Sequence, residues 1–230
     1  MEEWMQHLTT APLFRGIPEP VLVRDILPLG QLQELPRDYY LFAPQQQAEQ
    51  FGVILSGRVH ITHIFPDGSF SLINVLTARD AVGADLICTR SRVSPHHAIT
   101  ATACRILLFP AAVFLEPGHL EESTRQTVLG NLLTTIADEN IKKEYRLAIL
   151  SQKGLRERIL AYLTMQAAKR RTNTFTVPFS REEMASFLCV NRSALSHELS
   201  LLQQEGRISF RKNRFTLHDF GEDITKLFHT

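Results

Sequence analysis

The segment from Ser180 to Gly206 constrains the fold of this chain more than any other feature. Ser180 and Glu183 have the spacing of a capping box, in which the Ser hydroxyl accepts from the amide three residues on and the Glu carboxylate reaches back. Asn191 is suited to cap a second helix, and Gly206 is suited to end it. The sequence therefore predicts two short helices joined by a tight turn at residues 189–191.

The apolar residues of this segment recur where two crossed helices would bury them. Small Ala185 allows the helices to approach closely, and larger residues fill the space between them: Met184, Leu188, Val190 and Leu195. Cys189 stands where Gly is common, which predicts mild backbone strain in the turn. After Gly206, residues 207–210 and 214–217 alternate around a basic tip and predict a β-hairpin. The whole pattern predicts a winged helix-turn-helix.

Charge and residue type suggest a polyanion partner for this part of the chain. Residues 151–230 carry 13 Lys and Arg against 8 Asp and Glu, a formal charge of +5, whereas residues 1–150 carry −4. In this motif the second helix presents its first residues to base edges, and Arg192 there can donate two hydrogen bonds to a guanine. The predicted DNA contacts are Ser180, Arg181, Asn191, Arg192, Ser193, Ser196, His197, Arg211 and Lys212, with Arg214 as a further wing contact. A solvated surface charge is the alternative for each of them, and it stays strong for Arg211 and Lys212.

The first half of the chain predicts antiparallel β-structure. Runs rich in β-branched and aromatic residues occur at 51–55, 58–65 and 70–76, with turn residues between them. Asp67-Gly68 tolerates the positive φ of a tight hairpin turn. Short strands at this spacing predict a sandwich, barrel or jelly roll.

Residues 121–151 predict one long helix, because they contain no Pro and their apolar residues recur at helical spacing. A helix of about thirty residues is about 45 Å long, which favours a coiled-coil partner helix from a second copy. Asn140 lies within the apolar stripe, where a buried Asn can fix register and oligomeric state. The alternative is a core helix that packs only on its own sheet.

A β-rich domain, a long helix and a winged helix, in this order, resemble the CRP/FNR family of bacterial transcription regulators. The matching residues are Ile54-Leu-Ser-Gly-Arg-Val59, Asp67-Gly68, Val82-Gly83 and 180–208, including Arg192-Ser-Ala-Leu-Ser-His-Glu-Leu199. The resemblance implies a homodimer, an N-terminal cyclic-nucleotide-binding-like β-roll, effector-controlled promoter binding and contact with RNA polymerase. The expected fold class is α+β, with a β-roll or jelly-roll sensor domain at 1–118, a dimerisation helix at 119–151 and a winged-helix domain at 152–230.

The sequence departs from the family at the sensor. A cyclic-nucleotide site in this fold uses Gly-Glu-Leu and then Arg-Ser/Thr-Ala, whereas this chain has Gly83-Ala-Asp-Leu86 and then Ser94-Pro-His-His-Ala98. The carboxylate is shorter and displaced by one position, and the guanidinium that would pair with phosphate is replaced by imidazoles. We therefore expect an effector other than cAMP or cGMP, anionic or aromatic, or none. The candidate effector-binding residues are Gly83, Asp85, Leu86, His96 and His97.

Two other classes of protein could share some of these features. A cupin-like metal-dependent enzyme fused to a DNA-binding domain would draw ligands from His60, His63, His96 and His97. In a strand, residues three apart and adjacent residues face opposite sides, which disfavours that site. A DNA-independent adaptor would need a vestigial winged helix. No nucleophile motif occurs, so the sequence predicts neither catalytic residues nor metal ligands.

The cysteines and the apolar runs limit cofactors and location. The three Cys form no CxxC pair, and none precedes Cys88, so the N-terminal cysteine cluster of an iron–sulfur sensor is missing. The longest apolar run, Ile106–Leu115, is too short to span a bilayer, and the first residues lack the features of a secretory signal. The expectation is a soluble, cytoplasmic protein with no cofactor beyond an unknown small-molecule effector.

Overall fold

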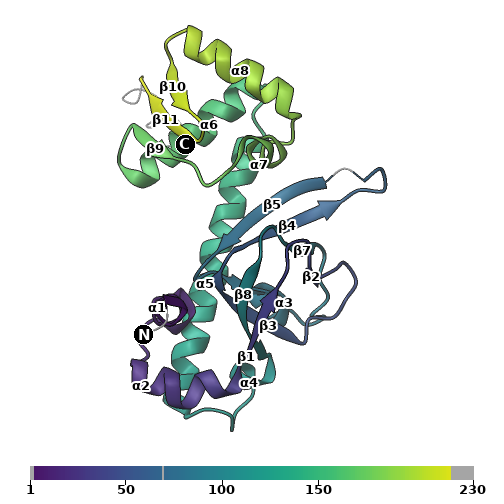
Figure 1. Cartoon of the computed structure of the whole chain (residues 1–230), viewed down its shortest axis with the longest axis vertical. Helices are drawn as coiled ribbons and strands as arrows, with labels where there is room; N and C mark the ends of the chain where they lie inside the picture. The colour runs from purple at the N-terminus through teal and green to yellow at the C-terminus, as the bar shows by residue number, and fades with distance from the viewer. Residues whose placement is uncertain (1–2, 69, 219–230) are drawn as a thin grey trace. The chain divides into compact units, whose positions relative to one another are not determined.

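The computed structural model describes residues 3–68 and 70–218 (Figure 1). The chain divides into two compact units, Met1–Ile141 and Lys142–Thr230, and the boundary falls within the long helix α5, Glu122–Leu150. This helix agrees closely with the one predicted at 121–151. The last part of the predicted winged-helix domain, 219–230, lies outside the described residues.

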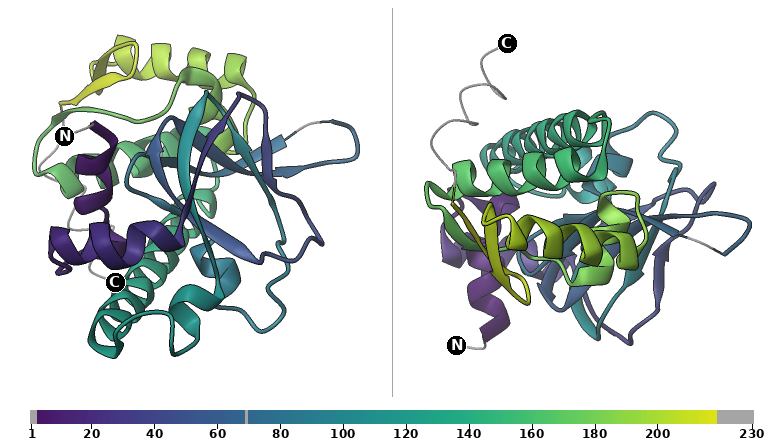
Figure 2. Two further views of the ribbon diagram at one scale, coloured as in Figure 1. Left: turned by 60° about the horizontal axis from the view of Figure 1, so that its bottom comes forward. Right: turned by 90° about the horizontal axis from the view of Figure 1, so that it is seen from above.

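The first unit begins with short helical segments, three of which have a proline at their first or second position. Proline suits the first helical turn because its missing N–H has no partner there in any case. These segments are the purple helices of Figure 2, and α1 contacts strand β3. They are α1 (Glu3–Thr9), η1 (Pro12–Phe14), α2 (Glu19–Val21), η2 (Leu22–Ile26) and η3 (Leu27–Leu29).

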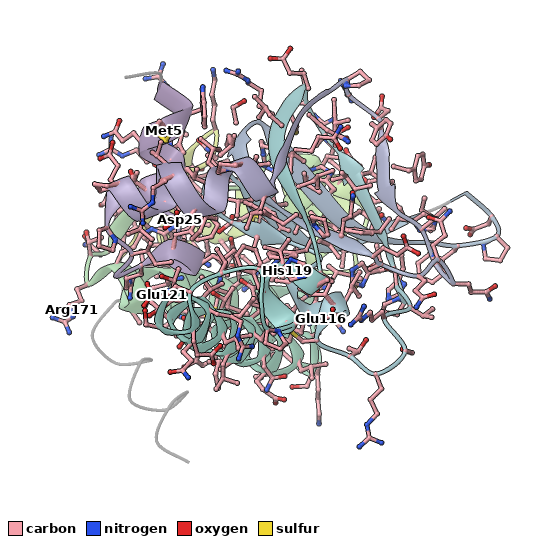
Figure 3. All side chains as sticks on the ribbon, turned by 90° about the horizontal axis from the view of Figure 1, so that it is seen from below. Met5, Asp25, Glu116, His119, Glu121 and Arg171 are labelled. Atoms are coloured by element: carbon pink, nitrogen blue, oxygen red, sulfur yellow. The ribbon has the colours of Figure 1, made fainter. Side chains whose placement is uncertain are left out.

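Side-chain bonds hold parts of this N-terminal region in place. Asn131 of α5 donates from Nδ2 to the carbonyls of Leu13, at 3.0 Å, and Arg15, at 2.8 Å. Arg24 donates to both carboxylate oxygens of Asp25 at 2.7 Å, and Glu121 adds a second negative charge near this guanidinium; Figure 3 labels both acids. The bond from Asn131 joins α5 to the N-terminal region within the first unit.

Two four-stranded antiparallel sheets follow, with strand orders β1-β8-β3-β6 and β2-β7-β4-β5. The predicted hairpin is confirmed, because β4 pairs with β5 across the turn and Gly68 has a φ of +79°. A short helix, α3 (Ala84–Ile87), lies between β6 and β7, and another, α4 (Ala112–Leu115), follows β8. The strands are β1 (Gln31–Leu35), β2 (Tyr40–Phe42), β3 (Gln50–Ser56), β4 (Arg58–Ile64), β5 (Phe70–Thr77), β6 (Ala81–Val82), β7 (His97–Thr100) and β8 (Cys104–Pro110).

The two sheets share an apolar core, to which the alternating strands β4 and β7 and the largely buried strand β8 contribute. On β4, Val59 and Ile61 are buried, and they pack with Ala98 of β7 and with Ile106 and Leu108 of β8. The residues therefore come from both sheets, which is the arrangement of a β-roll. The antiparallel sensor fold expected from the sequence is confirmed.

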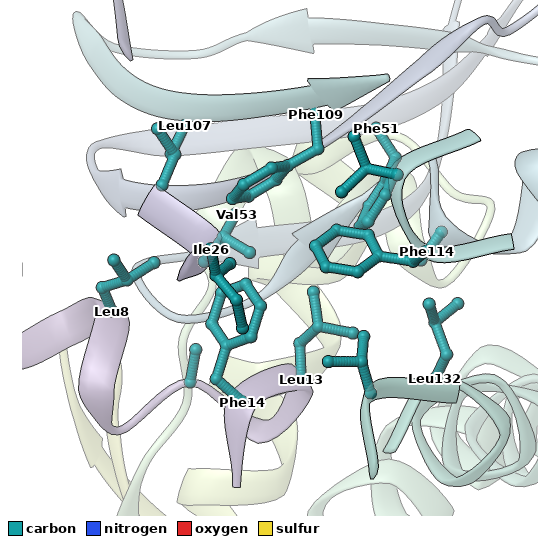
Figure 4. Close-up of a cluster of buried hydrophobic side chains, with 14 of the residues drawn as sticks. Leu8, Leu13, Phe14, Ile26, Phe51, Val53, Leu107, Phe109, Phe114 and Leu132 are labelled. Atoms are coloured by element: carbon teal, nitrogen blue, oxygen red, sulfur yellow. The ribbon is translucent and has the colours of Figure 1, made fainter. Parts of the chain in front are cut away.

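A second core cluster joins the β1-β8-β3-β6 sheet to the surrounding helices (Figure 4). Phe14 of η1, Phe51 of β3, Phe109 of β8 and Phe114 of α4 form its centre, with ring centroids 5.2 Å apart for Phe109 and Phe114. Such aromatic pairs add to the free energy gained by burying apolar surface. Val128 and Leu132 of α5 complete the cluster, so the first half of α5 is part of this unit's core.

The second unit contains the predicted winged helix-turn-helix. After α6 (Leu155–Arg170), the chain forms β9 (Thr174–Thr176), α7 (Arg181–Phe187), α8 (Arg192–Gln204), β10 (Ile208–Arg211) and β11 (Arg214–Leu217). The strands form an antiparallel sheet in the order β10-β11-β9. Tyr162 of α6 lies in the core of this unit, where its ring stacks on Phe179 at a centroid distance of 6.0 Å.

The Tyr162 hydroxyl offers a test of this core. Its side chain is 1% exposed, and its oxygen has no hydrogen-bond partner among the described residues. A buried polar group without a partner costs about 1–3 kcal/mol of stability. We expect Tyr162→Phe to raise the free energy of unfolding by about 1 kcal/mol in urea denaturation, whereas Tyr162→Ala lowers it by about 3–5 kcal/mol. A loss of stability in Tyr162→Phe would show that the hydroxyl has a partner.

Candidate DNA interface and sensor domain

The capping box predicted at the start of α7 is present. The Ser180 hydroxyl accepts from the Glu183 amide at 3.2 Å, and the Ser180 amide donates to Glu183 Oε2 at 2.6 Å. Two of the amides that a helix start leaves without partners are thus satisfied. The hydroxyl of Ser180 fixes the first turn of α7 and lies on an exposed residue.

A tight C-terminal cap makes the turn between α7 and α8. The Val190 amide donates to Ala185 O at 3.0 Å, and the Cys189 amide donates to Ser186 O at 3.1 Å. This is the pattern of a Schellman motif, which requires a left-handed residue after the helix. Cys189 takes that role with a φ of +57°, in a conformation that glycine adopts at lower cost. The positive φ of Cys189 agrees with the backbone strain predicted for this residue.

Asn191 caps α8 as the sequence predicted. Its Oδ1 accepts from the Ala194 amide at 2.7 Å and from the Ser193 hydroxyl at 2.8 Å. Asn191 and Ser193 are both predicted to contact DNA, and the bonds between their side chains and the Ala194 amide hold the start of α8 in place. The Asn191 Nδ2 group is not used in these two bonds.

The two sides of α8 differ sharply in burial. Leu195, Leu199 and Leu202 are each 0% exposed, so three turns of the helix are fixed to the rest of the unit. Arg192, Ser193 and His197 are exposed, and Ser196 is half-buried. Ser193 and His197 therefore lie on the side of α8 away from its leucines, whereas Arg192, three residues before Leu195, is exposed in the first turn of the helix.

Three ion pairs involve α8 or the residues next to it. The Arg192 guanidinium lies 3.8 Å from Glu182, and both side chains are more than 60% exposed, so the contact is weak and open to replacement. Glu198 instead accepts from Arg156 Nε at 2.7 Å, and the same guanidinium binds Glu205 through two bonds of 2.8 and 2.9 Å. The Glu198 side chain is thus bound to α6, one position after the last predicted DNA contact of this helix, His197.

Arg181, a predicted phosphate contact, is built into the base of the wing. Its guanidinium carbon lies 5.0 Å from the Phe210 ring centroid and 5.6 Å from that of Phe215, and Nη2 donates to Lys212 O at 3.0 Å. Burial, together with the nearby charge of Arg192, lowers the pKa of Arg181. Arg181 thus fastens the first turn of α7 to the hairpin, a role that sequence reasoning missed because the two segments lie about thirty residues apart.

The wing presents basic side chains at its tip. β10 and β11 pair from Ile208 to Leu217, and Arg211, Lys212 and Arg214 are exposed at the end of the hairpin. Lys212 has a φ of +55°, which places it in the tight turn. The β-hairpin with a basic tip that the sequence predicts is therefore confirmed.

The predicted effector residues lie in the first unit, in and around α3 and at the start of β7. Gly83 has a φ of +81° and begins α3, and the ring of Phe42 lies so close that a Cβ on Gly83 would meet it at 2.7 Å. Asp85 is half-buried within α3, and Leu86 is 3% exposed in the apolar core. His96 and His97 are half-buried, and the His97 ring contacts the Tyr40 ring.

The segment that would bind a cyclic phosphate is occupied by bonds within the chain. The Ser94 amide donates to Gln46 O at 2.9 Å, and the Ala48 amide donates to Arg92 O at 2.7 Å. Ser94 is 1% exposed, and its hydroxyl donates to His96 O at 2.6 Å. A phosphate site needs free amide donors and a guanidinium. The residues from Ser94 to Ala98 provide no arginine.

The chain matches two family models, the cyclic nucleotide-binding domain over residues 32–116 and the Crp-like helix-turn-helix domain over residues 157–222. The chain belongs to the CRP/FNR family of bacterial transcription regulators. Its sensor is thus a cyclic-nucleotide-binding-like domain in fold, and its Crp-like helix-turn-helix is a DNA-binding domain. Among residues 3–68 and 70–218, no helix is long and apolar enough to cross a membrane.

Relatives with curated names agree with this assignment. The nitrogen fixation regulation protein FixK of Azorhizobium caulinodans is 26% identical over 197 residues, which cover 82% of this chain and 75% of FixK. The transcriptional activator protein FnrL of Cereibacter sphaeroides is 25% identical over 174 residues, 71% of this chain and 66% of FnrL.

Solved structures share the fold. FixK2 from Bradyrhizobium japonicum has a TM-score of 0.64 at 17% identity, covering 86% of this chain and 95% of FixK2. The c-di-GMP responsive regulator CLP of Xanthomonas campestris has a TM-score of 0.67 at 16% identity, covering 86% of this chain and 98% of CLP. Both comparisons concern the fold of this CRP/FNR-family chain.

The cap on α8 gives a test that separates folding from DNA contact. Replacing a capping Asn by Ala costs about 1 kcal/mol of stability. We expect Asn191→Ala to lower the free energy of unfolding by that amount in urea denaturation. Asn191→Asp keeps the accepting oxygen and serves as the control with near-native stability. Equal losses in both variants would contradict the capping role.

Proposed function

We propose that this CRP/FNR-family protein is a homodimer that binds a palindromic operator and regulates transcription. One observation carries the proposal: α8 buries Leu195, Leu199 and Leu202 and exposes Arg192 and His197. A helix held in this way is a rigid element whose first residues are free to meet base edges in a major groove. The proposed segments are a sensor at 1–118, a dimerisation helix at 119–151 and a DNA-binding domain at 152–230.

Each DNA-facing residue has a proposed role. Arg192 reads a guanine through two hydrogen bonds, because its side chain is exposed and its partner Glu182 is held only weakly. Ser193, Ser196 and His197 add contacts to bases or phosphates from the same helix. The remaining predicted residues orient the unit on the phosphate backbone: Ser180, Arg181 and Asn191 at the helix starts, and Arg211 and Lys212 on the wing.

Exposed apolar side chains along α5 support a paired assembly. Leu133, Ile141 and Leu147 are 71%, 52% and 62% exposed, and Tyr145 is 42% exposed. Large apolar side chains repeating along one helix are typical of an interface with a second helix. Asn140, exposed beside them, is the proposed register-setting residue of the pair.

The assembly would meet its DNA and its partners in the cytoplasm. Two α8 helices related by a two-fold axis would place half-sites about 34 Å apart, one turn of DNA. Contact with RNA polymerase is proposed from membership of the family alone.

The effector is proposed to be a small molecule other than cAMP or cGMP. Two observations support this exclusion. The main chain at Arg92 and Ser94 is hydrogen-bonded to Ala48 and Gln46, and residues 94–98 include no arginine. The proposed contacts are Gly83, Asp85, Leu86, His96 and His97, with Leu86 contributing through the core. Such a ligand would regulate by binding two poses of the dimer with unequal affinity.

We propose no catalytic activity. The alternative of a cupin-like metal-dependent enzyme needs converging ligands, and no group of three His, Cys, Asp or Glu that could hold a metal occurs in the described parts of the chain. Stoichiometric metal in purified protein would revive that alternative.

Base reading by Arg192 is tested against phosphate contact by Lys212. The probes are a duplex selected from a random pool by the wild-type protein and an unselected duplex. We expect Arg192→Ala to relax the preference at one symmetric base pair and to cost about 1–3 kcal/mol on the selected duplex. Lys212→Ala should weaken binding to both duplexes alike and reduce the salt dependence.

Fluorescence anisotropy at several salt concentrations measures both variants. If Arg192→Ala loses equal affinity for both duplexes, Arg192 does not read bases.

The dimer is tested by introducing charge at its proposed interface. We expect the wild-type protein to sediment as a dimer at micromolar concentration, and Ile141→Asp to sediment as a monomer, because an unpaired carboxylate would be buried between the helices. Glu144→Asp, a conservative change at an exposed neighbouring position, is the control. A stable wild-type monomer would contradict the assembly.

A further inference from the structure

The C-terminal end of α7 is completed by a side chain from α5. The last four carbonyls of a helix have no partner within it. Three of those in α7 accept from amides of the turn that follows: Met184 O from Leu188, Ala185 O from Val190 and Ser186 O from Cys189. The fourth, Phe187 O, accepts from Arg146 Nη2 at 3.2 Å. A cation at this end is also favoured by the helix dipole.

Arg146 is held there by more than one contact. Its guanidinium carbon lies 4.8 Å from the centroid of the Phe187 ring. That ring is fixed in turn, since it lies 5.4 Å from Tyr162 and 5.0 Å from Phe179. Burial lowers the pKa of Arg146, and the nearby Cys189 of the turn opposes this effect. The side chain therefore joins α5 to both the end of α7 and the residues that lead into α8.

Arg146 lies on a different side of α5 from the exposed apolar residues. Arg146 and Ile149 are three residues apart on one side of the helix, and Ile149 is 3% exposed. Ile141, Tyr145 and Leu147, which form the proposed dimer surface, are exposed. The last turns of α5 thus present one side to the winged-helix unit and another to solvent.

We propose that Arg146 is a positioning residue for DNA reading, which holds the helix-turn-helix at a fixed angle on the end of the dimerisation helix. This rests on the proposed function, since the angle matters only if two α8 helices must meet two half-sites together. Base-edge contacts require close alignment of donors and acceptors, whereas phosphate contacts tolerate a tilt. Loss of Arg146 should therefore lower selectivity more than it lowers general DNA affinity.

Arg146→Ala tests this with a duplex selected by the wild-type protein from a random pool and an unselected duplex. We expect affinity for the selected duplex to fall about tenfold or more, as for loss of a hydrogen bond from a charged group. Affinity for the unselected duplex should fall less than about threefold, the scale of one lost charge near a polyanion. Sedimentation should show an unchanged dimer, and thermal unfolding should show a folded protein at the assay temperature.

Arg170→Ala is the matched control. Arg170 makes the same two kinds of contact within the same unit, donating to Gln166 O at 3.3 Å and lying 5.9 Å from the Phe175 ring centroid, but it does not cap α7. Like Arg146→Ala, the Arg170→Ala substitution removes one positive charge. We expect this variant to keep the wild-type ratio of the two affinities.

Arg146→Lys keeps the inference testable if the alanine variant does not fold. Lysine keeps the charge but lacks the planar fork that bonds a carbonyl while stacking on a ring. We expect a folded dimer whose selectivity lies between those of the wild type and the alanine variant. The inference is overturned if a folded Arg146→Ala variant keeps wild-type selectivity or loses equal affinity for both duplexes. If only Arg146→Lys folds, full wild-type selectivity in that variant overturns it. If the wild type selects no duplex at all, the proposed function itself fails, and this inference fails with it.

Discussion

The orientation of α8 depends on the burial of its leucine side. Leu195, Leu199 and Leu202 are fully buried, and each contributes about 1.5–3 kcal/mol relative to an exposed side chain. This packing fixes the rotation of α8 about its own axis, and that rotation decides which residues face outward. With the leucines buried, His197 faces outward and Arg192 is exposed at the start of the helix, and these are the two residues proposed to read bases. Without this constraint, the same basic side chains would be an ordinary solvated surface.

Caps and a tight turn also fix the ends of α7 and α8. The Ser180 cap, the left-handed Cys189 and the Asn191 cap determine where α7 begins, where it ends and how α8 leaves the turn. Arg181 and Arg146 then join α7 to the wing and to α5 through bonds to main-chain carbonyls and through contacts with aromatic rings. Charged side chains with positioning roles thus surround an apolar core, and they leave the exposed side of α8 free.

Local patterns in the sequence predicted much of this fold. The capping box, the Asn191 cap, the Asp67-Gly68 hairpin and the long helix depend on residues close together in the chain, and each is present. The roles of Arg181 and Arg146 were not predictable, because their aromatic partners lie thirty to forty residues away and no periodicity connects them. The main-chain bonds that join Arg92 and Ser94 to Ala48 and Gln46 were not predictable for the same reason, because the two segments lie more than forty residues apart.

Chemical protection of guanine N7 tests the central claim most directly, because N7 is exposed only in the major groove. The protein bound to a duplex that it has selected would be treated with dimethyl sulfate, and protected guanines would be mapped on both strands. The account predicts two symmetric protected patches with centres about one helical turn, roughly 34 Å, apart. Protection confined to minor-groove adenines, or a single patch without its symmetric mate, would contradict a paired α8 in the major groove.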